Sequence, residues 1–159
     1  RALGVIAAAA GAAGMVGGQA IDLDAVKPTI KAFTPASLRD MHARKTGALI
    51  RASVASGAIM AGASDSLFSA IDHYGNEIGL AFQIVDDILD EEGSSATLGK
   101  TAGKDKAAGK PTYPALFGLD RSKALAAECR ANATAALDRA GLLDSRLADI
   151  ARWIIERRA

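Results

Sequence analysis

The sequence of 159 residues is poor in aromatic side chains, proline and cysteine. Aromatic residues make up only 4% of it although 50% is hydrophobic, a balance that favours Ala- and Leu-rich helices over a β-sandwich. The single Cys129 excludes an internal disulfide, which suits a reducing compartment. We therefore predict one all-α domain in the cytoplasm.

An excess of charge of one sign is also missing. The 19 basic and 18 acidic residues leave a net charge of +1, and the lysines gather in one loop without interleaved aromatic residues. This excludes an extended nucleic-acid surface. The apolar opening segment RALGVIAAAAGAAGMVGG is interrupted by glycines, shorter than the about 20 residues of a membrane span, and starts at Arg1 instead of Met. We expect no nucleic-acid partner, no targeting role for this segment and no stable membrane insertion.

Helix signals cover the chain, and no strand pattern interrupts them. Thr34 and Pro35 predict an N-cap and a first-turn proline, and Ser64 predicts the cap of the helix that follows. His42 and the terminal Arg157 and Arg158 are expected at the solvated surface. The predicted helices cover residues 1–22, 35–60, 65–92 with a kink at Gly75 or Gly79, a short segment from Tyr113, 120–140 and 144–158.

A cluster of carboxylates lies in the otherwise apolar helical segment Phe82–Asp90. On a helix, Asp86 and Asp90 share a face and Asp87 is their neighbour. Such like charges destabilise a bare helix by about 0.2–0.5 kcal/mol per pair, so a cation is expected. Oxygen ligands without a zinc or EF-hand pattern favour Mg²⁺, which usually binds together with a phosphate. The alternative is a solvated acidic helix end, continued by Glu91 and Glu92.

A lysine-rich loop follows the acidic helix. The segment GKTAGKDKAAGK, residues 99–110, holds four lysines and three glycines. Lysine ammonium groups suit diphosphate oxygens, and glycines let the backbone approach an anion. A plain surface loop would have the same composition, but carboxylates followed by lysines are what a complex of Mg²⁺ with a diphosphate requires.

These segments together resemble a known family. FQIVDDILD and the following TLGKTAGKDKAAGKPTYPAL are similar to the second aspartate-rich motif and the lysine loop of the short-chain trans-isoprenyl diphosphate synthases, above all the bacterial farnesyl diphosphate synthases (geranyltranstransferases). GMVGGQAIDL and HARKTGALIRASV resemble two further blocks of that family in the same order. The resemblance implies a helical bundle of the isoprenoid synthase type.

The resemblance also implies the chemistry: isopentenyl diphosphate condenses with an allylic diphosphate, dimethylallyl or geranyl, to give farnesyl diphosphate. Gln19 is expected in the cavity wall or in a supporting hydrogen bond, and a solvated helix lysine is the alternative for Lys45. The implied Mg²⁺ ligands are Asp86, Asp87 and Asp90. The residues implied to hold the allylic diphosphate are Lys45, Thr46, Gln83, Lys100 and Lys110, of which Lys45, Thr46 and Gln83 act with Asp86 as the catalytic set.

Members of this family are longer and carry a first aspartate-rich motif upstream, which this sequence lacks. We therefore interpret residues 1–159 as the C-terminal half of a single synthase domain, expected to be a homodimer and, as this half alone, inactive or nearly so. The alternatives are a geranyl, geranylgeranyl or longer polyprenyl diphosphate synthase, or a non-catalytic partner subunit of the same fold. A terpene cyclase would share the fold but does not usually combine the KTG, FQxxDD and GK segments.

Overall fold

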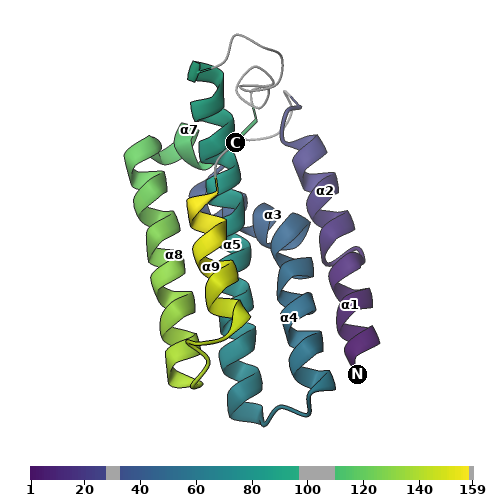
Figure 1. Cartoon of the computed structure of the whole chain (residues 1–159). Coiled ribbons are helices and arrows are strands. Elements are labelled where there is room, and N and C mark those ends of the chain that lie inside the picture. Colours follow the sequence, from purple (N-terminus) through teal and green to yellow (C-terminus); the bar gives the residue numbers. More distant parts are fainter. Residues whose placement is uncertain (28–32, 97–109, 158–159) are drawn as a thin grey trace.

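The computed structural model of the chain shows a bundle of helices around one long central helix, α5 (Asp65–Ala96). Helix α4 (Ala48–Met60) packs on one side of α5, and α8 (Leu119–Arg139) and α9 (Arg146–Glu156) pack on another (Figure 1). In the part of the chain that the structure describes there is no strand, so the all-α prediction is confirmed. The described residues are 1–27, 33–96 and 110–157, with the backbone alone at 94–96.

The N-terminal segment is two helices, so the prediction of one helix over residues 1–22 is wrong. Helix α1 (Ala2–Ala10) ends at Gly11, whose backbone is extended (φ −76°, ψ −167°), and α2 (Met15–Asp24) begins after a short turn. Helix α1 packs on α4, whereas α2 packs on the segment that precedes α4. The break therefore gives the two halves of this segment different neighbours.

By length and composition, Ala2–Asp24 is apolar enough to cross a membrane, with a mean hydropathy of 1.5 in its most apolar window. Only 11% of that window is buried within the described chain. Leu3 and Leu23 are among its exposed apolar side chains. The expectation that the segment does not insert stably stays a prediction, since a core helix of a larger domain passes the same test.

The helical path from Pro35 to Met60 is confirmed, including its start. Thr34 accepts a hydrogen bond from the Ser37 backbone, and the Ser37 hydroxyl accepts one from the Thr34 backbone, which makes a reciprocal cap. Between α3 (Pro35–His42) and α4 the path contains a π-helical turn, η1 (Ala43–Gly47), that the sequence pattern did not indicate. Such turns are frequent at functional sites.

The C-terminal helices are joined by capped turns. Thr112 caps α7 (Tyr113–Phe117) by accepting a hydrogen bond from the Ala115 backbone, and Gly118 takes a positive φ of 79° before α8 begins. The predicted bounds of α8 and α9 differ from the observed ones by one or two residues. Tyr74 of α5 donates a hydrogen bond to the Leu147 carbonyl at 2.7 Å, which fixes α9 against the central helix.

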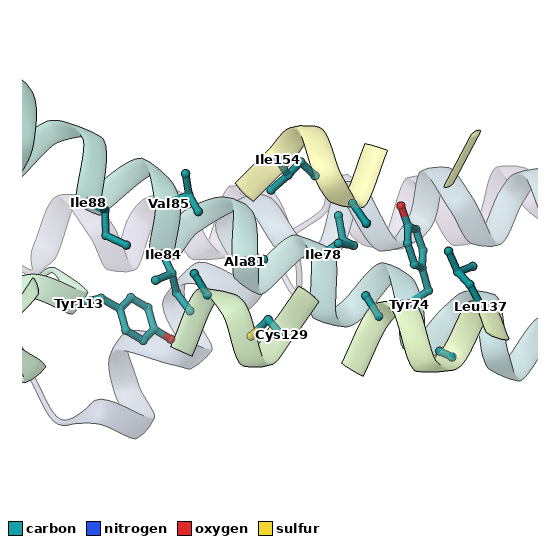
Figure 2. Packing of buried hydrophobic residues seen from close by; sticks show 14 of the residues in the cluster. Tyr74, Ile78, Ala81, Ile84, Val85, Ile88, Tyr113, Cys129, Leu137 and Ile154 are labelled. Carbon is teal, nitrogen blue, oxygen red and sulfur yellow. The ribbon is translucent and has the colours of Figure 1, made fainter. Parts of the chain in front are cut away.

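The core lies along α5 and is completed by small residues of α8. Tyr74, Ile78 and Ile84 are each at most 1% exposed, and Figure 2 shows Cys129 and Leu137 of α8 facing this row. Burial raises the pKa of the Cys129 thiol to about 12, with the Glu77 carboxylate adding to the shift. Cys129 is therefore a structural residue and not a nucleophile.

Gly75 and Gly79 do not break α5, which is continuous through both. A β-carbon at Gly79 would lie 2.9 Å from the Gly47 α-carbon of η1, and one at Gly75 would lie 2.6 Å from a methyl group of Val54. These glycines let η1 and α4 approach α5 closely. Their observed role is close contact between helices, and the kink that we expected there stays a prediction.

We predict that Gly79→Ala destabilises the chain by about 1–3 kcal/mol, because the new methyl group meets backbone of η1. Gly57 of α4 is the matched control, since nothing lies within 4 Å of a β-carbon there. Gly57→Ala should be neutral or stabilise by about 0.5–1 kcal/mol through helix propensity. Urea denaturation measures both free energies of unfolding, and equal changes for the two variants would contradict the close contact.

The burial of Cys129 predicts slow alkylation of the folded chain. Raising the thiol pKa from 9.0 to about 12 lowers the thiolate fraction at pH 8 about a thousandfold, and burial also hinders access. Iodoacetamide labelling followed by mass spectrometry should show rapid modification only in denaturant. Comparable rates in the native and the denatured chain would mean that α8 does not close on α5.

Candidate functional site

The π-helical turn η1 lies between α2 and α5 and presents two of the predicted site residues. Lys45 of η1 donates a hydrogen bond to the Asp22 carboxylate at 2.8 Å. Thr46, the next residue, donates one to the Gln83 side-chain oxygen of α5 at 3.1 Å. Lys45 is therefore half-buried and paired, and not the solvated lysine of the alternative interpretation.

Asp22 is the residue that the sequence reasoning missed. It is only 5% exposed, and the Lys110 ammonium group also lies 3.6 Å from its Oδ2 atom. Two lysines separated by 65 positions therefore meet at one buried carboxylate. Gln19, which we had placed near the site, is exposed in the described chain, and Asp22, three positions on in the same motif, makes the contact instead. An acidic residue within the apolar GGQAIDL segment was the signal available in the sequence.

The hydrogen bond between Thr46 and Gln83 orients both side chains. Gln83 is 7% exposed, and its amide oxygen accepts the hydrogen bond from the Thr46 hydroxyl group. Its amide nitrogen is therefore left as a hydrogen-bond donor. Gly79, one helical turn before Gln83, lets η1 come close enough for this bond. The structure therefore brings the predicted pair together through the same packing that stabilises the fold.

The three predicted metal ligands lie in three different environments. The Asp86 side chain is 61% exposed, and Asp90, one turn later, is partly exposed on the same helical face. Asp87 is buried, and its carboxylate accepts a hydrogen bond from the Tyr113 backbone at 2.9 Å. Asp87 therefore also attaches α7 to α5, a structural role that the sequence did not indicate.

A cavity of about 350 Å³ joins the acidic helix to the segment that carries Lys110. It is lined by Asp87, Asp90 and Glu91 of α5 and by Lys110 and Thr112 from the chain before α7. Lys110 therefore lies close to the Asp22 carboxylate and also lines this acidic cavity. Lys100, the other predicted loop lysine, lies outside the described residues.

These carboxylates fit Mg²⁺ as shared ligands. Among the described residues no three His, Cys, Asp or Glu side chains form a complete metal-binding group. Mg²⁺ in proteins usually keeps several waters and binds one or two carboxylates together with substrate phosphates. The hard oxygens of Asp86 and Asp90 are partly open to solvent, and Asp90 lines one cavity with Lys110, which matches that pattern. The assignment stays a prediction.

Arg157 is not the solvated residue that we predicted. Its guanidinium donates hydrogen bonds to the Phe82 carbonyl at 3.0 Å and to the Asp86 carboxylate at 3.3 Å, and it stacks 4.0 Å from the centre of the Phe82 ring. Its side chain is only 14% exposed. Arg157 directly follows α9, and its side chain contacts α5. Local sequence does not indicate such a tertiary contact.

His42 also differs from the prediction of a surface residue. It is 5% exposed, and its ring lies 5.6 Å from the Tyr113 ring between their centres. The π-helical turn η1 begins directly after it, at Ala43. His42 therefore packs behind the site and supports the segment that carries Lys110.

Comparison with known proteins identifies the family of this chain. The polyprenyl synthetase family model matches residues 4–142. The chain is 44% identical over 156 residues to the farnesyl diphosphate synthase of Escherichia coli, which covers 96% of this chain and 51% of that enzyme. It is also 44% identical over 133 residues to the chloroplastic geranylfarnesyl diphosphate synthase of Leucosceptrum canum, covering 84% of this chain and 36% of that protein.

A solved structure has the same fold. The crystal structure of the geranyltransferase of Helicobacter pylori complexed with magnesium and isoprenyl diphosphate matches with a TM-score of 0.78 at 29% identity, over 98% of this chain and 52% of that one. This chain spans about half the length of the Escherichia coli relative and about a third of the length of the plant relative. With a family match over most of its residues, the chain belongs to the polyprenyl synthetase family of trans-prenyltransferases.

Proposed function

We propose that this chain forms the allylic-diphosphate side of a Mg²⁺-dependent farnesyl diphosphate synthase. The observation that carries the proposal is that Lys45 and Lys110 meet at Asp22, while Lys110 also lines the cavity that holds Asp87 and Asp90. A cation for phosphate oxygens and hard oxygens for a metal thus line one space, and Asp22 brings Lys45 next to that cation. An allylic diphosphate in complex with Mg²⁺ needs both.

In the proposed reaction, the bond between allylic carbon and diphosphate oxygen breaks, and the diphosphate leaves with the electron pair. The double bond of isopentenyl diphosphate then forms a bond to the allylic carbon, and the adduct loses a proton. Mg²⁺ would neutralise charge on the leaving diphosphate, and Asp86, Asp87 and Asp90 would hold it. Lys45, Lys100 and Lys110 would bind the remaining oxygens.

Thr46 and Gln83 act as neutral groups in this proposal. Their mutual hydrogen bond at 3.1 Å fixes the direction of the Gln83 amide, which can orient the leaving group or face positive charge on carbon. Neutral donors and oxygens are suited to this position because a full negative charge would repel the diphosphate. The largely buried setting of Gln83 also keeps water from the reacting carbon.

The proposal includes the context of the chain. We infer that it is the C-terminal half of a single synthase domain, that the complete enzyme is a cytoplasmic homodimer, and that the half by itself is inactive or nearly so. The upstream half would supply the first aspartate-rich motif and the isopentenyl site. Because relatives make farnesyl and geranylfarnesyl diphosphates, the product length is the least supported part of the proposal.

The test is binding of geranyl diphosphate with Mg²⁺, measured by calorimetry on this chain. Asp86→Ala should weaken binding about tenfold or more, because a charge-assisted contact to the bound metal is lost. Asp138→Ala is the matched control, since Asp138 is an exposed aspartate near the end of α8. Equal affinities of wild type and Asp86→Ala would overturn the ligand assignment. A product assay with isopentenyl diphosphate on the same sample tests the expected inactivity of the half.

Arg157 gives a second prediction about Asp86. Because the guanidinium and a metal ion compete for the same carboxylate, Arg157→Met should raise the affinity for Mn²⁺, used as a spectroscopic probe, about two- to fivefold, the range expected for a partly exposed ion pair. Arg152→Met on α9 is the control, because Arg152 faces Asp149 and not α5. Unchanged Mn²⁺ affinity in Arg157→Met would mean that Asp86 does not bind the metal or that Arg157 does not oppose it.

A further inference from the structure

Asp22 lies between the two described lysines of the proposed diphosphate site. Its carboxylate is 5% exposed, 2.8 Å from the Lys45 ammonium group and 3.6 Å from that of Lys110. A buried carboxylate is costly unless cations or hydrogen bonds compensate it. The two lysines compensate the charge of the carboxylate. The same carboxylate holds their ammonium groups close together, although the lysines come from distant parts of the chain.

We propose that Asp22 is a positioning residue that holds Lys45 and Lys110 at the separation needed to receive a diphosphate. This inference rests on the proposed function, because the two lysines bind phosphate oxygens only if the site is the allylic one. Asp22 itself contacts neither substrate nor reacting atoms in this role. It acts through the direction and spacing of the two ammonium groups.

The backbone fixes the position of Asp22. A β-carbon at Gly18 would lie 2.2 Å from the Lys45 nitrogen and 2.5 Å from its α-carbon, so α2 touches η1 at Lys45 itself. Residues four apart share one face of a helix, which directs the Asp22 side chain toward the Lys45 side chain. The carboxylate is thus held by packing of two backbones, whereas lysine side chains have four flexible bonds.

Two roles for this carboxylate predict opposite effects on anion binding. If Asp22 only offsets positive charge, its removal raises the positive potential and diphosphate binds more tightly. If Asp22 positions the lysines, its removal lets two like charges separate, and both side chains must be ordered again when the ligand binds. The sign of the change in affinity therefore distinguishes positioning from simple neutralisation.

The probe is inorganic pyrophosphate, titrated by calorimetry into the 159-residue chain without added metal. We expect Asp22→Asn to weaken binding about tenfold, since a displaced binding group loses most of its contribution. Asp22→Glu keeps the charge but moves the carboxylate by one methylene into a packed contact, so it should also weaken binding. Asp24→Asn is the matched control, because Asp24 lies on the same helix, is half exposed and pairs with Lys27 instead.

Every result of these titrations either supports or overturns the positioning role of Asp22. Equal or tighter binding of Asp22→Asn in a folded variant would overturn the positioning role, and if that variant does not fold, Asp22→Glu with wild-type affinity would overturn it. Circular dichroism melting without ligand identifies loss of folding. The variant Lys45→Met separates this inference from the proposed function. If Lys45→Met binds pyrophosphate as tightly as wild type does, the proposed function and the positioning role both fail. Both also fail if wild type does not bind pyrophosphate. If Lys45→Met weakens binding and Asp22→Asn does not, only the positioning role fails.

Discussion

The close packing of α2 and α5 on η1 is the constraint on which both fold and site depend. Gly18 and Gly79 lack the β-carbon that would collide with η1 from either side. One turn after each glycine a polar residue, Asp22 or Gln83, meets a side chain of η1. Because helix geometry puts residues four apart on one face, the contact that packs the backbones also aligns these polar pairs.

Helix α5 serves the core and the site with different faces. Its buried residues, such as Ile78 and Ile84, belong to the core shared with α8 and α9, while Asp86 is exposed on another face. Asp87 lies between these two environments and is attached to the Tyr113 backbone. The helix can hold these carboxylates because its buried apolar residues continue along the opposite side as far as Ile88 and fix its position.

The sequence was sufficient for most of the helices and for naming candidate site residues, for physical reasons. Caps such as Thr34 and Pro35 are local signals, and the carboxylates of α5 contradict an apolar pattern, so both can be recognised without a structure. The roles of Asp22, His42 and Arg157 could not be predicted this way. Each depends on a partner that is distant in sequence. The π-helical turn η1 has no local signature in the sequence.

The charges of the site explain how a diphosphate could be bound and still released in the proposed reaction. Lys45 and Lys110 share the negative charge of Asp22, so this group of three carries a net charge of about +1 and not +2. Firm binding of such a polyanion would then require the proposed metal at the acidic face of α5, and the affinity would fall when that metal leaves. Arg157 adds to this balance, since it pairs with Asp86, one of the proposed metal ligands, at 3.3 Å. In the proposed site, the lysines alone would therefore bind a diphosphate measurably, and the metal would make that binding tighter.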